Sequence, residues 1–204
     1  MRKTVEETEK TRRLLVECAT RRFILEGFSA TKLEDIAADA GLTRGAFYWH
    51  FKNKQAIFRA IIEENSKEAL KLVARYLEND HDPAERIKDF VRHLLGDRHR
   101  KNHQVFVLIR LKQQPPSGLA NMDDQIPSVE EIVVPALEDT IKEGKQMGIF
   151  GAALDAAFSA KCIYTFFWGF FVNYDSLYKD YTDEQLIQQI NGFLSQLLGI
   201  KTTW

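Results

Sequence analysis

The residues best suited to chemistry lie between Thr31 and Phe58, in the segment TKLEDIAADAGLTRGAFYWHFKNKQAIF. Arg44 carries a guanidinium fork that matches the O6 and N7 edge of guanine in the major groove of DNA. Tyr48 and His50 carry groups that can hydrogen-bond to phosphates or base edges. Gly45 removes side-chain bulk where a helix must approach a duplex closely. These residue types predict nucleic-acid contact.

Two short helices and a tight turn are expected to position these side chains. Thr31 is predicted to cap the first helix in a capping box with Glu34. Gly41 is predicted to end that helix in the left-handed conformation, and Thr43 to cap the second helix. The inward stripe of the first helix has helical spacing and consists of Leu33, Ile36, Ala37 and Ala40. A helix, a glycine turn and a second helix form the helix-turn-helix pattern, whose second helix enters the major groove.

Two features of this segment need separate interpretation. Lys54 begins the next helix, where a positive side chain beside free backbone N–H groups favours a phosphate. The aromatic residues Tyr48, Trp49 and Phe51 could instead belong to the hydrophobic core of this segment. We expect a core position for Phe51, and both roles stay open for Trp49.

The run T-x4-IA-x2-AG-x-T-x-G-x2-Y-x-HF-x2-K-x3-F resembles the N-terminal domain of TetR-family transcriptional regulators. The shorter run TRGAFYWHFKNK is similar to the branch that controls multidrug efflux pumps. With the lead-in RKTVEETEKTRRLLVECATRRFILEGF, the resemblance covers about residues 2 to 60. The predicted DNA-binding residues are Thr31, Thr43, Arg44, Gly45, Ala46, Tyr48, Trp49, His50 and Lys54.

The resemblance implies an all-α protein with two domains. Residues 1–53 would form a three-helix helix-turn-helix DNA-binding domain, and residues 54–204 a helical ligand-binding and dimerisation domain. It also implies a homodimeric repressor that a hydrophobic or amphipathic small molecule releases from a pseudo-palindromic operator, with an efflux pump as one candidate target. The alternative is an architectural or partner-regulated DNA-binding protein without a small-molecule ligand.

Charge is divided unevenly along the chain, whose formal net charge is -1. Residues 1–60 contain 12 Lys and Arg against 8 Asp and Glu, whereas residues 61–204 contain 16 against 21. A basic N-terminal segment followed by an acidic remainder is expected when only one end of the chain meets phosphate.

Other function classes lack their signatures. No GxSxG, HExxH, Walker A or GxGxxG motif occurs in a fitting context, so we expect neither an enzyme nor a cofactor. His93, His99 and His103 have no Cys or carboxylate that completes a metal-binding set. Cys18 and Cys162 are far apart and no signal peptide is evident, so free thiols in the cytoplasm are expected. The apolar run CIYTFFWGFFVNY is too short to span a membrane.

The remaining pattern predicts further helices. A long helix is expected from Lys54 to about Leu77, followed by helices from Pro83 to Gly96 and around residues 105–111, then a loop over 113–127. Ser128 is predicted to cap a helix kinked at Pro135. The last two helices are expected over residues 154–178 and from Thr182 to about Leu198. Those two would pair with a partner subunit in a four-helix interface, with a monomeric bundle as the alternative.

A ligand pocket is expected among the aromatic residues of this C-terminal part. Each of these side chains could equally belong to the core. The candidate ligand-binding residues are Phe90, His93, Phe106, Phe167, Trp168, Phe171 and Asn173.

Overall fold

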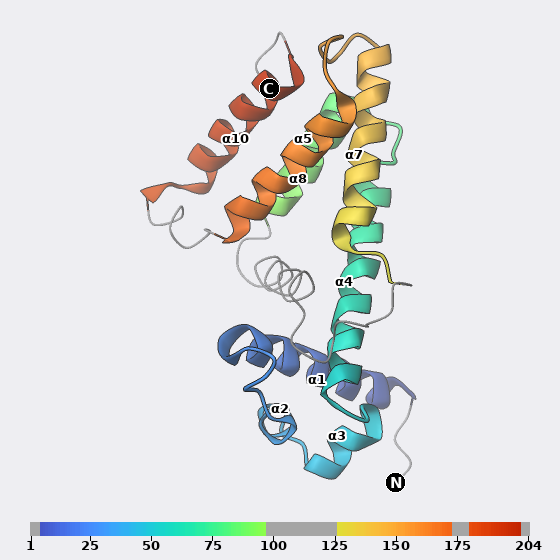
Figure 1. Ribbon diagram of the computed structural model, residues 1–204, viewed down its shortest axis with the longest axis vertical. Coiled ribbons are helices and arrows are strands. Elements are labelled where there is room, and N and C mark those ends of the chain that lie inside the picture. Colours follow the sequence, from blue (N-terminus) through green and yellow to red (C-terminus); the bar gives the residue numbers. More distant parts are fainter. Residues whose placement is uncertain (1–4, 97–125, 173–179, 201–204) are drawn as a thin grey trace. The chain divides into compact units, whose positions relative to one another are not determined.

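The computed structural model describes residues 5–96, 126–172 and 180–200, and every regular element in these ranges is an α-helix (Figure 1). The predicted all-α class is confirmed. Among the described residues, no helix is both long enough and apolar enough to cross a membrane. The helices are α1 (Val5–Glu26), α2 (Leu33–Asp39), α3 (Arg44–His50), α4 (Lys54–Tyr76), α5 (Pro83–Gly96), α7 (Val129–Gln146), α8 (Ala156–Val172) and α10 (Asp183–Leu198).

The described residues divide into two compact units. The first contains residues 5–65 and Ile126, and the second contains 66–96, 127–172 and 180–200. Helix α4 therefore contributes its first half to one unit and its second half to the other. The expected domain boundary after residue 53 stays a prediction. The predicted helix between residues 105 and 111 and most of the 113–127 loop lie outside the described residues.

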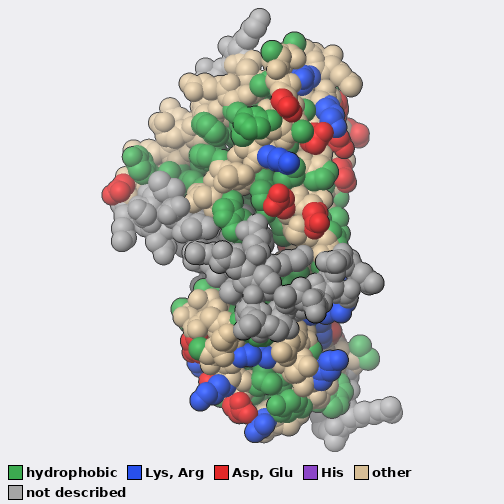
Figure 2. Space-filling model, viewed as in Figure 1, with side chains coloured by type: hydrophobic (Ala, Val, Ile, Leu, Met, Phe, Trp, Pro, Cys, Tyr) green, Lys and Arg blue, Asp and Glu red, His purple; other side chains and the backbone are tan. Residues whose placement is uncertain are grey.

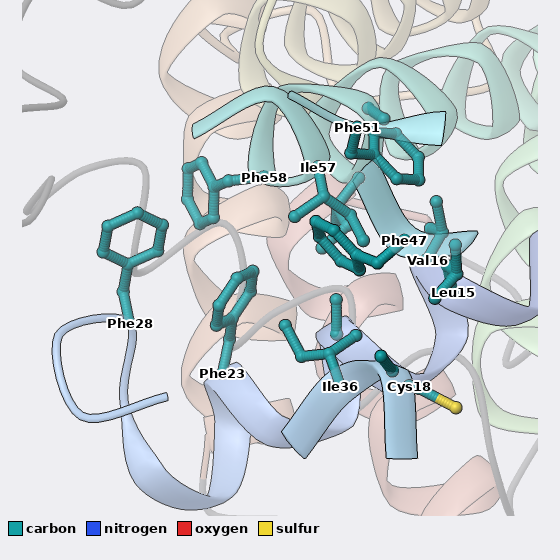
Figure 3. Close-up of a cluster of buried hydrophobic side chains, with 14 of the residues drawn as sticks. Leu15, Val16, Cys18, Phe23, Phe28, Ile36, Phe47, Phe51, Ile57 and Phe58 are labelled. Atoms are coloured by element: carbon teal, nitrogen blue, oxygen red, sulfur yellow. The ribbon is translucent and has the colours of Figure 1, made fainter. Parts of the chain in front are cut away.

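The first unit has its own core of aromatic and branched side chains. Phe23 and Phe28 have ring centroids 5.1 Å apart, and the Phe58 ring lies edge-on to both, as Figure 3 shows. This arrangement suits aromatic pairs, which prefer edge-to-face contact. The buried members of this core are Leu15, Val16, Cys18, Ala19, Phe23, Phe28, Ile36, Ala37, Phe47, Phe51, Ile57, Phe58, Ala60, Ile61 and Ile62.

The second unit is built on the pairing of α7 with α8, with α5 against α7 and α10 against α5 and α8. The predicted cap at Ser128 is confirmed. Ser128 Oγ accepts the Glu131 N–H at 3.2 Å, and the Glu131 carboxylate accepts the Ser128 N–H at 2.6 Å, which completes a capping box. Thr182 and Gln185 form the same motif at the start of α10.

A buried arginine joins three elements of the second unit. Arg86, on α5, donates from Nη1 to the Leu77 carbonyl oxygen at 3.0 Å, just beyond the end of α4. Its Nη2 donates to the Glu143 carboxylate on α7. The Thr140 hydroxyl also donates to the Leu77 carbonyl oxygen, at 3.4 Å. These bonds satisfy a carbonyl that the end of α4 would leave without a helical partner.

Close packing at the end of α7 requires a glycine. A β-carbon at Gly144 would lie 2.3 Å from the ring of Phe150, which is buried. The Phe150 N–H also donates to the Gly144 carbonyl oxygen at 3.2 Å, so the ring is held against the helix. A side chain at position 144 would therefore displace the Phe150 ring from its place at the turn between α7 and α8.

We expect Gly144→Ala to lower the free energy of unfolding by about 1–3 kcal/mol, because the added methyl group overpacks the contact with Phe150. Urea unfolding followed by circular dichroism measures this change. Phe150→Leu supplies the control, since a smaller side chain leaves room for the methyl group. The cost of Gly144→Ala should fall in the Phe150→Leu background, and an undiminished cost there would contradict the steric explanation.

Candidate nucleic-acid interface

The turn between α2 and α3 follows the sequence expectation. Gly41 has a φ of +66°, which a side chain would oppose. Its N–H donates to the Ala38 carbonyl oxygen at 2.9 Å, and the Leu42 N–H donates to the Ala37 carbonyl oxygen at 2.9 Å. These two bonds form a Schellman motif. The motif ends α2 and turns the chain into α3 within a few residues.

Thr43 caps α3 as predicted. Its Oγ1 accepts the Ala46 N–H at 3.2 Å, and its backbone is extended, with φ of -79° and ψ of 158°. Phe47 is the only residue of α3 that is fully buried. The start of this seven-residue helix is therefore fixed by the Thr43 cap, and its middle by the Phe47 side chain.

The predicted capping box at Thr31 is wrong. The N-cap residue of α2 is Lys32, and no side chain caps this helix. Thr31 is only 2% exposed, and its hydroxyl donates to the Gly27 carbonyl oxygen at 2.8 Å. The hydroxyl is thus bonded within the segment between α1 and α2 and does not cap α2. A buried side chain with this partner does not support the predicted role of Thr31 in DNA binding.

An ion pair holds α2 against α1. Arg22 Nε donates to Asp39 Oδ2 at 2.7 Å, and Arg22 Nη2 donates to Asp39 Oδ1 at 2.8 Å. Hydrogen bonds from Arg22 lower the pKa of the Asp39 carboxyl, and those to Asp39 and Glu26 raise the pKa of Arg22. Two parallel bonds fix the relative orientation of the two groups as well as their distance.

The solvent-facing side of α3 carries most of the predicted DNA-binding residues. The side chain of Arg44 is 65% exposed, Tyr48 is 43% exposed and Trp49 is 68% exposed. The exposure of Trp49 excludes a core position within the first unit, whereas Phe51 is buried as expected. Thr43 and Gly45 are also exposed, and Ala46 and His50 are half-buried.

Position 45 has space that the protein itself does not fill. A β-carbon at Gly45 would meet only Thr43 Oγ1, at 3.9 Å. Packing inside the chain therefore does not require glycine here. A requirement for glycine at this position would come from a surface outside the chain.

Arg44 is oriented by two neighbours on the surface. Its guanidinium lies 5.6 Å from the centre of the Tyr48 ring and 3.2 Å from the Glu34 carboxylate. Hydrogen bonding to Tyr48 and the charge of Glu34 raise the pKa of Arg44. Both partners are exposed, so solvent screens the pair and its contribution to stability is small. The arrangement holds the guanidinium beside the first turn of α3.

Lys54 has partners that the sequence did not indicate. Its ammonium donates to the carbonyl oxygens of Phe28, Ser29 and Thr31 at 2.6, 3.1 and 2.8 Å. It also lies 4.8 Å from the centre of the Phe28 ring. Burial lowers the pKa of Lys54. The predicted contact of Lys54 with DNA phosphate stays a prediction, but in this structure its donors face the protein.

The candidate ligand-binding residues have varied surroundings. Phe90 and Phe167 are buried, while Trp168 and His93 are half-buried. The His93 ring stacks on Tyr76 with centroids 4.9 Å apart, and its Nδ1 is 3.2 Å from the Tyr76 hydroxyl. Phe106, Asn173 and the Phe171 side chain lie outside the described residues. The ligand-binding role of this set stays a prediction.

Among the described residues, no group of three or more His, Cys, Asp and Glu side chains is placed to hold a metal ion. Cys18 and Cys162 are free thiols in this structure. On the face of the first unit that Figure 2 shows, Lys and Arg side chains lie at several separate places, with Asp and Glu side chains among them. Exposed Lys32 and Lys52, which flank α2 and α3, were not singled out by the sequence pattern.

Residues 15–61 match the family model described as "Bacterial regulatory proteins, tetR family". The N-terminal domain is that of the tetR family. This match confirms the resemblance stated from the sequence. It covers α2, α3 and their turn together with the parts of α1 and α4 that form the core of the first unit.

Curated relatives are similar in sequence to part of this chain. The HTH-type transcriptional regulator TtgR of Pseudomonas putida is 46% identical over 63 residues, which are 31% of this chain and 30% of that protein. AcrR of Shigella flexneri is 38% identical over 95 residues, which are 46% of this chain and 44% of that protein. The matches thus span less than half of these relatives.

Solved structures extend the similarity in fold to nearly the whole chain. NalD, the secondary repressor of the MexAB-OprM multidrug efflux pump in Pseudomonas aeruginosa, aligns with a TM-score of 0.72 at 19% identity over 96% of this chain and 98% of NalD. AibR, solved in complex with isovaleryl coenzyme A and operator DNA, aligns with a TM-score of 0.70 at 19% identity over 93% of this chain and 99% of AibR. At this identity the likeness shows the fold alone.

The ion pair between α1 and α2 predicts a pH dependence of stability. Because the pKa of Asp39 is lowered in the folded protein, its contribution is present above the pKa of the unfolded carboxyl, and it is lost as the pH falls through the folded value. Asp39→Asn should therefore lower the urea midpoint at pH 7, and this deficit should shrink progressively below about pH 4. Asp35→Asn, on the same helix, is the control. A deficit for Asp39→Asn that does not change with pH would contradict this account.

Proposed function

We propose that this protein is a transcriptional repressor whose α3 reads an operator in the major groove and which a hydrophobic or amphipathic small molecule releases from DNA. The observation that carries this proposal is the exposed face of α3. Arg44, Tyr48 and Trp49 extend into solvent from a short helix whose opposite face is fixed by Phe47. A helix presented in this way matches the second helix of a helix-turn-helix domain.

The chemistry of α3 supports base reading by Arg44 and phosphate contact by its neighbours. A guanidinium on the first turn can reach the O6 and N7 atoms of guanine in a bidentate contact. The hydroxyls of Thr43 and Tyr48 and the indole N–H of Trp49 are donors suited to phosphate oxygens. Glycine at 45 leaves space for the duplex beside Arg44. His50 and Ala46 would lie at the margin of this contact, because both are half-buried.

The charge distribution supports the same orientation. The first 60 residues contain 12 Lys and Arg against 8 Asp and Glu. This modest excess favours the negatively charged backbone of DNA. It is small for a protein that relies on charge alone, so it agrees better with an operator-specific regulator than with an architectural binder.

We propose that the repressor is a homodimer formed through α8 and α10. Phe158, on α8, is 64% exposed, and Phe193, on α10, is 40% exposed. The Phe193 ring stacks on Phe166 with centroids 4.7 Å apart, so the two helices share an aromatic surface. An isologous interface of this kind would place two α3 helices on two half-sites of a pseudo-palindromic operator.

The proposed ligand would bind in the second unit, in contact with aromatic residues of α5 and α8. Phe90 and Phe167 supply apolar surface, and Trp168 and His93 supply aromatic surface with polar edges. That NalD represses a multidrug efflux pump supports an apolar or amphipathic compound as ligand, and an efflux pump as the regulated target. Ligand and operator would then bias one conformational equilibrium in opposite directions.

Fluorescence anisotropy tests the proposal as a whole. Labelled DNA from upstream of the protein's own gene would be titrated at fixed salt against scrambled DNA of the same length. We expect tighter binding to the upstream fragment, and its loss when a hydrophobic compound from a panel is added. Binding that ignores both sequence and compounds would contradict the repressor and favour the architectural alternative.

We expect Arg44→Ala to cost about 1–3 kcal/mol of binding to the selected operator and to relax preference at one base pair of each half-site. Selection of binding sites from random DNA measures the preference, and anisotropy measures the cost. Arg13→Ala is the matched control, since it removes the same charge from an exposed position on α1. If both variants lower affinity equally for every sequence, Arg44 does not read a base.

A compound that releases the DNA should also stabilise the DNA-free protein. Because ligand binding to the folded state adds about 2.7 kcal/mol at 100 times Kd, the melting temperature should rise with compound concentration. Differential scanning fluorimetry measures the rise. A compound that releases DNA without changing the melting temperature would act on the DNA or unfold the protein, and would contradict a ligand site in the second unit.

A further inference from the structure

Residues 27–32, between α1 and α2, form the α1–α2 connector. The connector is closed by hydrogen bonds to the carbonyl group of Gly27. Gly27 has a φ of +82°, and its carbonyl oxygen accepts both the Thr31 N–H at 3.3 Å and the Thr31 hydroxyl at 2.8 Å. This closure leaves the carbonyl groups of Phe28, Ser29 and Thr31 without partners in the connector. The carbonyl groups of Phe28 and Thr31 are in part-buried surroundings, where a carbonyl group without a partner is costly, so donors from elsewhere stabilise the connector.

Lys54 supplies all three donors. An ammonium group has three protons, and Lys54 Nζ lies within 3.1 Å of the three carbonyl oxygens. Phe28, whose ring covers the ammonium at 4.8 Å, is itself buried against Phe23 and Phe58. The half-buried ammonium is therefore held by three carbonyl dipoles and one face of an aromatic ring. A fourth partner such as a phosphate would have to displace one of these carbonyls.

The position of Lys54 on its own helix does not explain the residue. It is the first residue of α4, and the first turn of α4 has no acidic residue. A positive charge at a helix N-terminus is opposed by the helix dipole. The three carbonyl groups and the Phe28 ring offset this cost, so lysine at 54 is explained by the connector and not by α4.

We infer that Lys54 is a positioning residue which closes the helix-turn-helix, and not a contact to DNA phosphate. Its three bonds join the start of α4 to the connector before α2, across 23 to 26 residues of sequence. Helices α2 and α3 lie entirely between these two points. The bonds thus hold the entry to α2 and the exit from α3 at a fixed separation. For DNA binding this inference rests on the proposed function, but its structural part does not.

Lys54→Met tests the inference in the full-length protein, because methionine keeps much of the length and removes the charge and all three donors. Hydrogen exchange measured by mass spectrometry should show connector amides exchanging at least tenfold faster than in the wild type. The melting temperature should fall by at least about 2 °C, a shift of the size expected when a chain of this length loses one set of stabilising contacts. Lys52→Met, at an exposed position two residues earlier, should change neither quantity.

The salt dependence of DNA binding separates positioning from phosphate contact. The slope of log Kobs against log salt should match that of the wild type in Lys54→Met, whereas loss of a phosphate contact would reduce its magnitude by about 1. A reduced slope with unchanged exchange and melting temperature would overturn the inference. If the wild type does not select DNA, the proposed function fails, and exchange and melting temperature alone decide the role of Lys54.

A variant that keeps the charge covers the case in which Lys54→Met does not fold. The donors of the guanidinium in Lys54→Arg lie in one plane on a longer side chain, so they do not reproduce the directions in which the Lys54 ammonium donates to its three carbonyl groups. We expect faster exchange in the connector and wild-type exchange in α7 and α8. Wild-type exchange in the connector of Lys54→Arg would overturn the inference, because the three specific bonds would then be dispensable.

Discussion

Burial of Phe47 is the interaction on which the proposed DNA-reading surface depends. Helix α3 has seven residues, a length at which an isolated helix is not stable in water. Phe47 is fully buried, with its ring 6.0 Å from that of Phe51 and edge-on to Tyr48 at 5.8 Å. Burying such a side chain contributes about 1.5–3 kcal/mol. The burial of this ring in the core of the first unit therefore gives the exposed residues of α3 a defined direction.

Other contacts of the first unit hold its helices in place around this core. Arg22 and Asp39 hold α2 to α1, and the Schellman turn at Gly41 sets the direction in which α3 leaves α2. Lys54, at the start of α4, donates hydrogen bonds to carbonyl groups of the α1–α2 connector. None of these residues lies on the exposed face of α3. The first unit thus separates residues that position the helix from residues that are available to a partner.

The sequence predicted features that depend on neighbouring residues along the chain. The turn at Gly41, the caps Thr43 and Ser128, the start of α5 at Pro83 and the start of the last helix near Thr182 follow from local backbone chemistry, and the structure confirms them. The predicted end of the long helix near Leu77 is also close to the observed end of α4 at Tyr76.

Features that depend on partners distant in sequence were not predicted. Thr31 has the residue type and spacing of a capping box, but burial and the Gly27 carbonyl give its hydroxyl a different use. Lys54 has the position of a phosphate ligand, but three carbonyl groups more than twenty residues earlier take its donors. Aromatic residues such as Phe90 and Phe167 have the same spacing whether they line a core or a pocket, so the pattern alone did not separate the two.

Hydroxyl-radical footprinting of the protein tests most directly whether α3 is the surface that meets DNA. Trp49 and Tyr48 are exposed aromatic side chains on α3 that the radical oxidises readily, and exposed Met147, at the end of α7, is an internal reference. Operator DNA should protect Trp49 and Tyr48 strongly and leave Met147 unchanged. Equal oxidation of Trp49 and Tyr48 with and without bound DNA would contradict the proposal that α3 reads the operator.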